Sequence, residues 1–353
     1  MSQITTSDNP TSSKKAAASL SQLSFDSSAP LLEVEDLEVE FHTRDGVAHA
    51  VNKVSFALNA GETLGILGES GCGKSVTAQA IMGILDSPPA KVTGGQVRYR
   101  GVDLLQLDEK SRRHIRANKI AMIFQDALSS LNPVFTVGWQ LGELYRQHAG
   151  ASRKEAKAKA VELLDMVGIP AAADRVNDFP HQFSGGMRQR VMIAMALALQ
   201  PDVIIADEPT TALDVTVQAQ VMSLLSDLQR EMQLGLILIT HDMGVVADVA
   251  DKICVMYAGH AVERANVYEI YERPAHPYTK ALLESIPRVD QKGQELTVIK
   301  GLPPALTSPP PGCAFHPRCT FARDRCKTEE PPLYQVPGNR DSACHFWEEV
   351  LNS

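Results

Sequence analysis

Apolar and polar residues alternate along the chain just after its first thirty residues. The apolar positions are Leu32, Val34, Leu37, Val39 and Phe41, followed further on by Val54, Phe56 and Leu58. Acidic residues stand between the members of the first group. Because successive side chains of a strand point to opposite faces, this alternation is typical of a strand with one buried and one solvated face. We therefore predict a half-exposed antiparallel edge strand, followed by a second strand of the same kind.

Continuous apolar runs replace this alternation later in the chain. They occupy residues 62–67, 203–206, 236–239 and 253–256. Strands of a parallel sheet are buried on both faces and have such runs. A polar, helix-favouring stretch over residues 104–181 separates the first run from the second, and residues 153–167 within it are strongly helical. The pattern predicts an α/β fold with a helical insertion.

Composition divides the chain further. Residues 1–30 are rich in Ser, Thr and Ala, so we expect a disordered lead-in that is neither a signal peptide nor an anchor. The expected main domain is residues 31–270, with the helical subdomain at about 104–185, and a proline-rich extension follows at residues 271–353. The net charge of −8 argues against nucleic acid as a ligand. Since no apolar run is long enough to cross a bilayer, we expect a cytoplasmic protein that reaches a membrane only through a partner.

A glycine-rich motif follows the first apolar run. The pattern G-x-x-x-x-G-K-[ST], the P-loop that holds nucleotide phosphates, is met by Gly68-Glu69-Ser70-Gly71-Cys72-Gly73-Lys74-Ser75, and Val76 follows it. Glycines let the backbone approach a phosphate closely, so that successive N–H groups form an anion-binding nest. We expect Lys74 to contact the β- and γ-phosphates and the hydroxyl of Ser75 to ligate Mg²⁺. The helix expected at residues 75–85 directs the positive end of its dipole at the same place.

Two acidic residues end the apolar run at residues 203–206. A carboxylate there can hold Mg²⁺ directly or through water, because this ion keeps several waters and takes few protein oxygens. We assign that role to Asp207. Glu208, the next residue, is then placed to polarise the attacking water as a general base. An apolar strand with two terminal acids is weakly specific alone, and its specificity comes from the P-loop upstream.

A second glycine-containing turn precedes a long apolar helix. Ser184-Gly185-Gly186-Met187 offers a phosphate-sized nest ahead of residues 191–199. One nucleotide does not need two such cradles from the same face. We therefore expect this turn to contact the ATP of a partner subunit.

These elements together resemble a known family. In order along the chain they are the P-loop, Gln125, Ser184-Gly185-Gly186, Asp207-Glu208, Ala212-Leu213-Asp214 and His241. The same order is seen in ATP-binding cassette (ABC) ATPases, and the resemblance covers about residues 31–265. It implies the fold of that family, a P-loop NTPase domain with a parallel core sheet, an antiparallel β subdomain and a helical subdomain.

The resemblance also implies roles for single residues. Gln125 matches the glutamine that senses Mg²⁺ and the γ-phosphate, Asp214 the aspartate at the dimer interface, and His241 the switch histidine that contacts the γ-phosphate. Met187 stands where many cassettes have Gln. Phe41 and Arg44 are alternative candidates for stacking on adenine. The predicted catalytic residues are therefore Lys74, Gln125, Glu208 and His241, and the predicted Mg²⁺ ligands are Ser75, Gln125 and Asp207.

Four of the six cysteines lie in the extension. They are Cys313, Cys319, Cys326 and Cys344, with the spacing C-x5-C-x6-C-x17-C. Disulfides are not expected in a reducing cytoplasm, whereas four thiolates suit Zn²⁺ or an iron–sulfur cluster. The spacing lacks the C-x2-C pairs of ordinary zinc ribbons, which argues against zinc. A bound metal would also supply folding free energy to a segment that is poor in large apolar residues.

The extension narrows the resemblance. His276-Pro277-Tyr278-Thr279 and Pro311-Gly312-Cys313-Ala314-Phe315-His316-Pro317-Arg318-Cys319 resemble the C-terminal region of D-type ATPases from oligopeptide and dipeptide importers. In that family the four cysteines are associated with a [4Fe–4S] cluster, which we adopt here, with Zn²⁺ as the alternative. The resemblance implies an ATP-hydrolysing, energy-coupling subunit that lies peripherally on the cytoplasmic face of the inner membrane.

The same resemblance implies partners. A homologous ATPase would pair head-to-tail with this chain, two membrane permeases would dock on the pair, and a substrate-binding protein would act indirectly. One alternative is the same role in an importer for nickel or another small solute. Another is a soluble ABC ATPase without a transport role. The single P-loop and the lack of a sustained heptad run between Gly68 and Ser184 argue against that second alternative.

Overall fold

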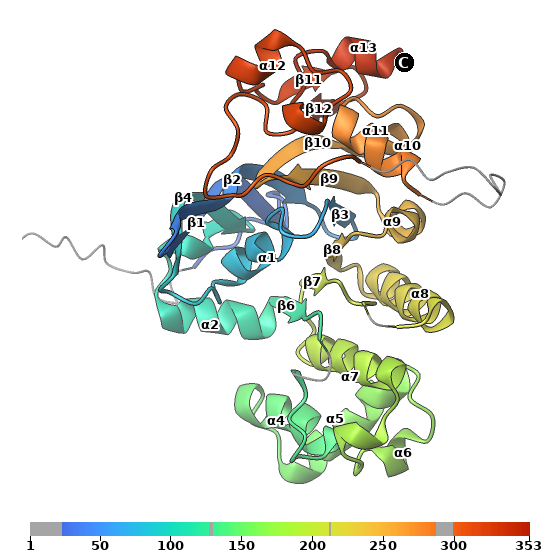
Figure 1. Ribbon diagram of the computed structural model, residues 1–353. Helices are drawn as coiled ribbons and strands as arrows, with labels where there is room; N and C mark the ends of the chain where they lie inside the picture. The colour runs from blue at the N-terminus through green and yellow to red at the C-terminus, as the bar shows by residue number, and fades with distance from the viewer. Residues whose placement is uncertain (1–22, 127–129, 212, 287–298) are drawn as a thin grey trace, which may run out of the picture.

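An eight-stranded sheet runs through the described residues of the computed structural model, which are 23–126, 130–211, 213–286 and 299–353 (Figure 1). In spatial order its strands are β11 (Tyr334–Val336), β12 (Arg340–Ser342), β10 (His260–Asn266), β9 (Lys252–Tyr257), β3 (Thr63–Leu67), β8 (Gly235–Thr240), β7 (Val203–Asp207) and β6 (Ile120–Ile123). The run from β9 to β6 is parallel, as the continuous apolar runs predict. Most of the expected lead-in at residues 1–30, and Ala212, lie outside the described residues.

The parallel strands are buried on both faces and divide the interior into two cores. In β7, Val203 and Ile205 pack into one core, whereas Ile204 and Ala206 pack into the other. The first core is shared with a smaller antiparallel sheet, and the second with helices. Alternate side chains of one strand thus join the two layers, which explains why these strands are continuously apolar.

The antiparallel sheet has four strands in the described part of the chain. In spatial order they are β2 (Gly46–Leu58), β1 (Leu32–Thr43), β4 (Ala90–Tyr99) and β5 (Val102–Asp103). The prediction that the first strand is an edge strand is wrong, because β1 pairs with β2 on one side and with β4 on the other. The acids that suggested a solvated edge form ion pairs with the neighbouring strand. Arg98 of β4 lies 2.9 Å from Glu33 and 2.8 Å from Glu35.

Helices cover the main sheet. Those of the core are α1 (Lys74–Met82), α2 (Glu109–Asn118), α8 (Val215–Met232) and α9 (Met243–Val249), and a 3₁₀ turn, η2 (Leu104–Gln106), precedes α2. The strand β6 interrupts the stretch expected to be helical over residues 104–185 and belongs to the main sheet through its pairing with β7. The helices of the insertion therefore come after β6. The sequence pattern did not reveal this strand, because its run of four apolar residues is short and directly follows the charged helix α2.

A lobe of helices forms one end of the molecule (Figure 1). It contains α4 (Val137–His148), α5 (Arg153–Met166), α6 (Ala172–Arg175), the 3₁₀ turn η3 (Pro180–Gln182) and α7 (Gly185–Leu197). Ser152 begins α5 with a capping box, in which its hydroxyl accepts from the N–H of Glu155 and the Glu155 carboxylate accepts from the N–H of Ser152. Such reciprocal bonds satisfy two donors that a helix start leaves free.

The C-terminal extension forms the opposite end of the molecule (Figure 1). It begins within α10 (Val267–Glu272), which spans the expected boundary at residue 271. Its further elements are α11 (Pro277–Glu284), the 3₁₀ turn η4 (His316–Arg318), α12 (Asp324–Thr328), the strands β11 and β12, and α13 (Trp347–Leu351). The β11–β12 hairpin continues the main sheet through β10, so the extension builds on the core of the main domain. No helix among the described residues is long and apolar enough to span a bilayer.

Candidate active site

The P-loop joins the end of β3 to the start of α1. Gly68, Gly71 and Gly73 have φ values of 151°, 79° and 105°, which residues with a side chain rarely adopt. A Cβ at Gly73 would lie 2.2 Å from the carbonyl oxygen of Ala50 in β2, and one at Gly68 would lie 2.2 Å from that of Met256 in β9. The loop therefore lies too close to both strands for any other residue at these two positions.

Lys74 is the first residue of α1, and only 5% of its surface is exposed. Its Nζ donates to the carbonyl oxygens of Gly68 at 2.7 Å and of Glu69 at 3.1 Å. A buried ammonium needs such partners to offset the loss of water. The two carbonyls thus hold the positive charge over the loop that the motif predicts to bind phosphate.

Ser75 and Asp207 meet at the carboxyl end of β7. The Ser75 hydroxyl donates to Oδ1 of Asp207 at 2.9 Å. Burial raises the pKa of Asp207 and the neighbouring Glu208 adds to the shift, whereas the bond from Ser75 and the charge of Lys74 oppose it. A divalent cation would favour the ionised carboxylate. A hydroxyl and a carboxylate side by side are the hard oxygen donors that Mg²⁺ takes, so the pair fits this ion.

Glu208 receives hydrogen bonds from separate segments. Its Oε2 accepts from Nε2 of Gln125 at 2.7 Å and from the hydroxyl of Thr211 at 2.9 Å. Nδ1 of His241, which follows β8, lies 3.4 Å from Oε1. The structure thus brings together three predicted catalytic residues, Gln125, Glu208 and His241. The contact of Gln125 with Mg²⁺ stays a prediction. Thr211 is not among the predicted residues, and a hydroxyl three positions after the acid is its only sequence signal.

The backbone of Glu208 is strained. Its φ of 47° lies in the left-handed region, and its N–H donates to the carbonyl of Ile239 at 2.9 Å. Residues with a Cβ hold such a conformation where the surrounding structure fixes it, often at functional sites. Here the bond to β8 and the three side-chain contacts fix it, so the carboxylate has one defined position.

The second glycine turn is built differently. Ser184 caps α7 by accepting from the N–H of Met187 at 3.3 Å, and Ser184 and Gly185 are exposed. A Cβ at Gly186 would lie 2.4 Å from Cγ1 of Val217 in α8, so glycine lets these helices approach. Asp214 caps α8 by accepting from the N–H of Val217 at 3.0 Å. The start of α7 therefore presents its N–H groups outward beside the start of α8.

The adenine contact remains a prediction. Phe41 is half-buried in β1, opposite Ala48 of β2 and Ala90 of β4. Arg44 is exposed in the turn between β1 and β2. Val76 is half-buried on α1 and packs against the core between the sheets. None of these positions distinguishes Phe41 from Arg44 as the stacking residue.

The four cysteines of the extension line one small cavity of about 10 Å³, here named the four-cysteine cavity. The N–H of Cys313 donates to the carbonyl of Cys326 at 2.9 Å, which joins two of its walls. Burial raises the pKa of Cys319 and of Cys344 to about 12, and the neighbouring cysteines add to both shifts. Across the described ranges, no three His, Cys, Asp or Glu side chains form a group that could hold a metal ion. Within these ranges the geometry thus shows no metal site of either kind, and both the [4Fe–4S] cluster and the alternative Zn²⁺ stay predictions.

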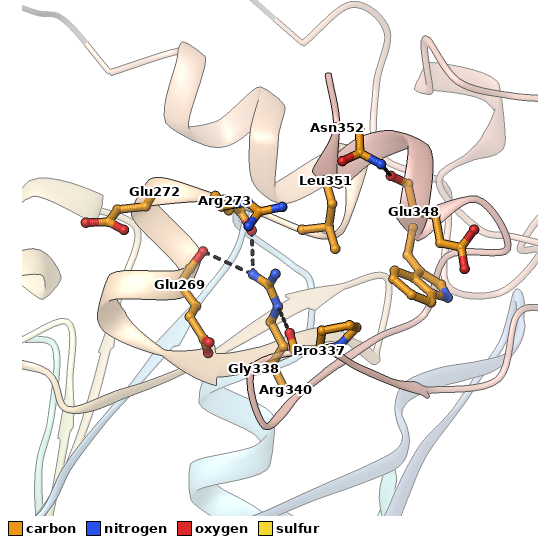
Figure 2. Close-up of a pocket in the computed structure, with 10 residues that line it drawn as sticks. Glu269, Glu272, Arg273, Pro337, Gly338, Arg340, Glu348, Leu351 and Asn352 are labelled. Carbon is orange, nitrogen blue, oxygen red and sulfur yellow. Dashed lines mark hydrogen bonds between the residues drawn. The ribbon is translucent and has the colours of Figure 1, made fainter.

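A larger cavity of about 510 Å³ lies elsewhere in the extension, between α10 and α13 (Figure 2). Arg340 extends into its wall and donates to the backbone carbonyls of Pro337, Glu269 and Arg273. These bonds tie the β11–β12 hairpin to α10. The lining residues include none of the nucleotide motifs, so this cavity is separate from the candidate active site.

The P-loop between β3 and α1, with the carboxylates of Asp207 and Glu208 at the end of β7, defines the class of protein as a P-loop ATPase. Two family models match the chain: ABC transporter at residues 51–211, and oligopeptide/dipeptide transporter, C-terminal region, at residues 262–326. The dimeric post-hydrolysis structure of the ATP-binding cassette MJ0796 with ADP and phosphate has a TM-score of 0.60 and 29% identity. The similarity covers 67% of this chain and 98% of that one.

Curated relatives extend the similarity into the C-terminal region. The oligopeptide transport ATP-binding protein OppD of Bacillus subtilis (strain 168) is 52% identical over 307 residues, which are 87% of this chain and 86% of the relative. The dipeptide transport ATP-binding protein DppD of Escherichia coli (strain K12) is 46% identical over 316 residues, which are 90% and 96% of the two chains. The chain belongs to the ABC transporter ATP-binding proteins of the oligopeptide/dipeptide family. It is an ABC-type ATPase, and the predicted family and fold class are confirmed.

Proposed function

We propose that this chain is the ATP-hydrolysing, energy-coupling subunit of an importer for oligopeptides or dipeptides. One observation carries the proposal: the hydrogen-bonded set around Glu208 occurs in the same chain as the C-terminal region that peptide transport relatives share. The proposed division is an ATPase domain at residues 31–270 and the extension at residues 271–353. Peptide as the cargo rests on the relatives, since a cassette fold alone does not specify what is moved.

The chemistry follows from the positions of the side chains. Phosphoryl transfer needs positioning and charge compensation more than covalent chemistry. Lys74 and the loop amides would neutralise the phosphate oxygens, and Ser75 with Asp207 would hold Mg²⁺, which supplies further charge compensation when bound. Glu208 would accept a proton from the attacking water, because Gln125, Thr211 and His241 fix its carboxylate at the end of β7.

A second ATPase would complete the site. Ser184, Gly185 and Gly186 present donors at the exposed start of α7, a position where an anion is stabilised by unpaired N–H groups and the helix dipole. We assign them to the γ-phosphate of a homologous subunit's ATP, with Asp214 at the same interface. Head-to-tail pairing would then form two composite sites.

Exposed apolar side chains close to Gln125 in the sequence suit docking of the permeases. Phe124, Val134, Phe135 and Trp139 are all exposed, by 40%, 69%, 37% and 37%. The rings of Phe135 and Trp139 are stacked with centroids 4.0 Å apart. Large apolar side chains that are exposed and packed against each other, as Phe135 and Trp139 are, are typical of a docking surface. We propose that a cytoplasmic helix of a permease binds here and brings the chain to the cytoplasmic face of the membrane, with the substrate-binding protein acting through the permeases.

The spacing of the four cysteines and the resemblance to importer ATPases support a [4Fe–4S] cluster over a zinc ion. All four cysteines line the same cavity, so they lie in one part of the extension. A zinc ion would draw its sulfurs to about 2.3 Å from one point, whereas a cluster takes one cysteine at each of its irons. Cys313, Cys319, Cys326 and Cys344 would hold the cluster, which would supply folding free energy to the extension.

Two measurements test these proposals. Uptake of a labelled dipeptide and of nickel is compared in cells with and without this chain, with Glu231→Gln, an exposed change on α8, as the control variant. Loss of peptide uptake alone supports the proposed cargo, and loss of nickel uptake alone replaces it with the alternative.

The cluster is tested separately, by assaying iron and sulfide in anaerobically purified protein. One zinc with no iron would refute the cluster.

A further inference from the structure

The C-terminal extension grips the P-loop directly. Arg318, at the end of η4, lies against Glu69, the first variable residue of the motif and 249 positions away along the chain. The guanidinium forms a fork on the carboxylate, with one Nη 2.5 Å from Oε2 and the other 2.9 Å from Oε1. The Arg318 side chain is only 4% exposed. Two parallel bonds from a buried guanidinium fix both distance and orientation.

The remaining donors of Arg318 are also satisfied. They reach the Tyr257 hydroxyl at 3.3 Å and the carbonyl oxygens of Ile299 at 3.4 Å and Lys300 at 3.3 Å. With the two bonds to Glu69, each of the five N–H groups of the guanidinium has a partner. A side chain this fully engaged has one position, so it can act as a rigid support.

Tyr278 binds the backbone of the same loop residue, Glu69. Its hydroxyl accepts from the N–H of Glu69 at 2.8 Å, and its ring is fully buried. The ring lies 4.6 Å from that of Tyr257 and 5.2 Å from that of Phe315, measured between centroids. Since Phe315 precedes η4, one packed cluster of rings carries both contacts to Glu69.

Glu69 in turn orients the phosphate-binding lysine. Its carbonyl oxygen accepts from Nζ of Lys74 at 3.1 Å. Glu69 also brings a carboxylate into a loop that must bind an anion, and an unpaired carboxylate there would repel the phosphates. Arg318 both fixes this residue and compensates its charge.

We propose that Arg318 is a positioning residue for nucleotide binding, through which the extension shapes the P-loop and neutralises Glu69. The proposal rests on ATP binding and not on the cargo, so a failed peptide-uptake assay leaves it untouched. Removing Arg318 would leave Glu69 charged beside the phosphates and free to turn, whereas removing both groups would restore neutrality.

A double-mutant cycle on the full chain tests it. All proteins carry Glu208→Gln so that ATP is bound without being consumed, and equilibrium binding of ATP is measured well below the melting temperature. We expect Arg318→Gln to raise the Kd by about tenfold or more. Arg318→Gln should cause no further loss of affinity in a Glu69→Gln background. Arg323→Gln, which breaks an exposed ion pair with Glu349 in the same extension, is the control and should leave the Kd unchanged.

Two results would overturn the proposal: a Kd for Arg318→Gln within twofold of the parent, or single effects that multiply in the double variant. The second result would mean that Arg318 supports the fold without acting through Glu69. If Arg318→Gln does not fold, Arg318→Lys takes its place, because it keeps the charge and loses the fork. Its Kd should rise by about threefold, and an unchanged Kd counts against the proposal. In the assembled complex with native Glu208, Arg318→Lys should raise the KM for ATP while kcat stays within about twofold of the parent.

Discussion

The P-loop and the second glycine turn of this chain are built in opposite ways. The P-loop is held by contacts within this chain. Lys74 donates to two loop carbonyls, Ser75 donates to Asp207, and Glu69 is bound by Arg318 and Tyr278. At the other region, Ser184 bonds within its own helix, and Ser184 and Gly185 are exposed. The difference supports the proposal that one half of an ATP site is complete in the chain and that the Ser184 turn serves a nucleotide bound by a second subunit.

The largest effect on activity should come from Glu208, the proposed general base beside the P-loop. In the assembled complex, we expect Glu208→Gln to lower ATP hydrolysis by about 10²–10⁴-fold while ATP binding stays within a few-fold of the parent. The amide cannot take a proton from water, yet it fills the same space. Phosphate release and equilibrium ATP binding measure the two properties. Hydrolysis at the parental rate would show that another group is the base.

The next effect should separate the two halves. We expect Ser184→Arg to leave ATP binding at the chain's own P-loop unchanged and to lower hydrolysis in the paired complex by about 10²-fold, because donors to the partner's nucleotide are displaced. Ser152→Arg, which removes an equivalent helix cap at α5, is the matched control for lost capping. If both variants lose the same activity, capping and not contact with ATP explains the loss.

Two glycine substitutions, one in each turn, test the comparison between the P-loop and the Ser184 turn through the stability of the protein. Gly73→Ala places a Cβ 2.2 Å from the Ala50 carbonyl at a φ of 105°, and we expect it to lower the free energy of unfolding by about 3 kcal/mol. Gly185→Ala places its Cβ 3.6 Å from Leu213, an ordinary contact, and should change stability by less than about 1 kcal/mol. Urea unfolding measures both. Equal losses would mean that the two turns are equally constrained.

The smallest expected effect concerns a buried acid in β10, which contacts the segment that precedes Tyr278. Glu263 in β10 is fully buried, and its carboxylate accepts from the N–H groups of Ala275 at 2.6 Å and His276 at 3.0 Å, just before α11 and Tyr278. Burial raises its pKa from 4.5 to about 7. The folded state therefore binds the proton more tightly, so the stability that this group contributes is present below pH 4.5 and is lost as the pH rises through 7.

Glu263→Gln should remove this dependence. Between pH 5.5 and 6.5 we expect the parent to lose about 1 kcal/mol of unfolding free energy relative to the variant. Urea unfolding at the two pH values measures the difference, and taking it between the two proteins cancels the other titrating groups. A parallel pH dependence of the two proteins would contradict the assignment.

Local patterns predicted much of this structure. The continuous apolar runs predicted the parallel strands, and the spacing of Gly68, Lys74 and Ser75 predicted a loop between a strand and a helix. The acids of β1 misled because their partner, Arg98, lies on a strand far along the chain. The contact of Arg318 with Glu69 was not predicted for the same reason, since no local pattern specifies which distant side chains meet. Thr211 lies only three positions after Glu208, but a single hydroxyl in the sequence does not show that it bonds to the acid.

The dependence of hydrolysis on pairing tests the central claim most directly. ATP turnover per chain is measured for the isolated protein over a dilution series, and again after addition of the homologous ATPase and the permeases. Turnover should fall toward background on dilution and rise on assembly, because each P-loop needs the exposed glycine turn of a second subunit. A constant turnover per chain at every dilution, unaffected by Ser184→Arg, would contradict the account.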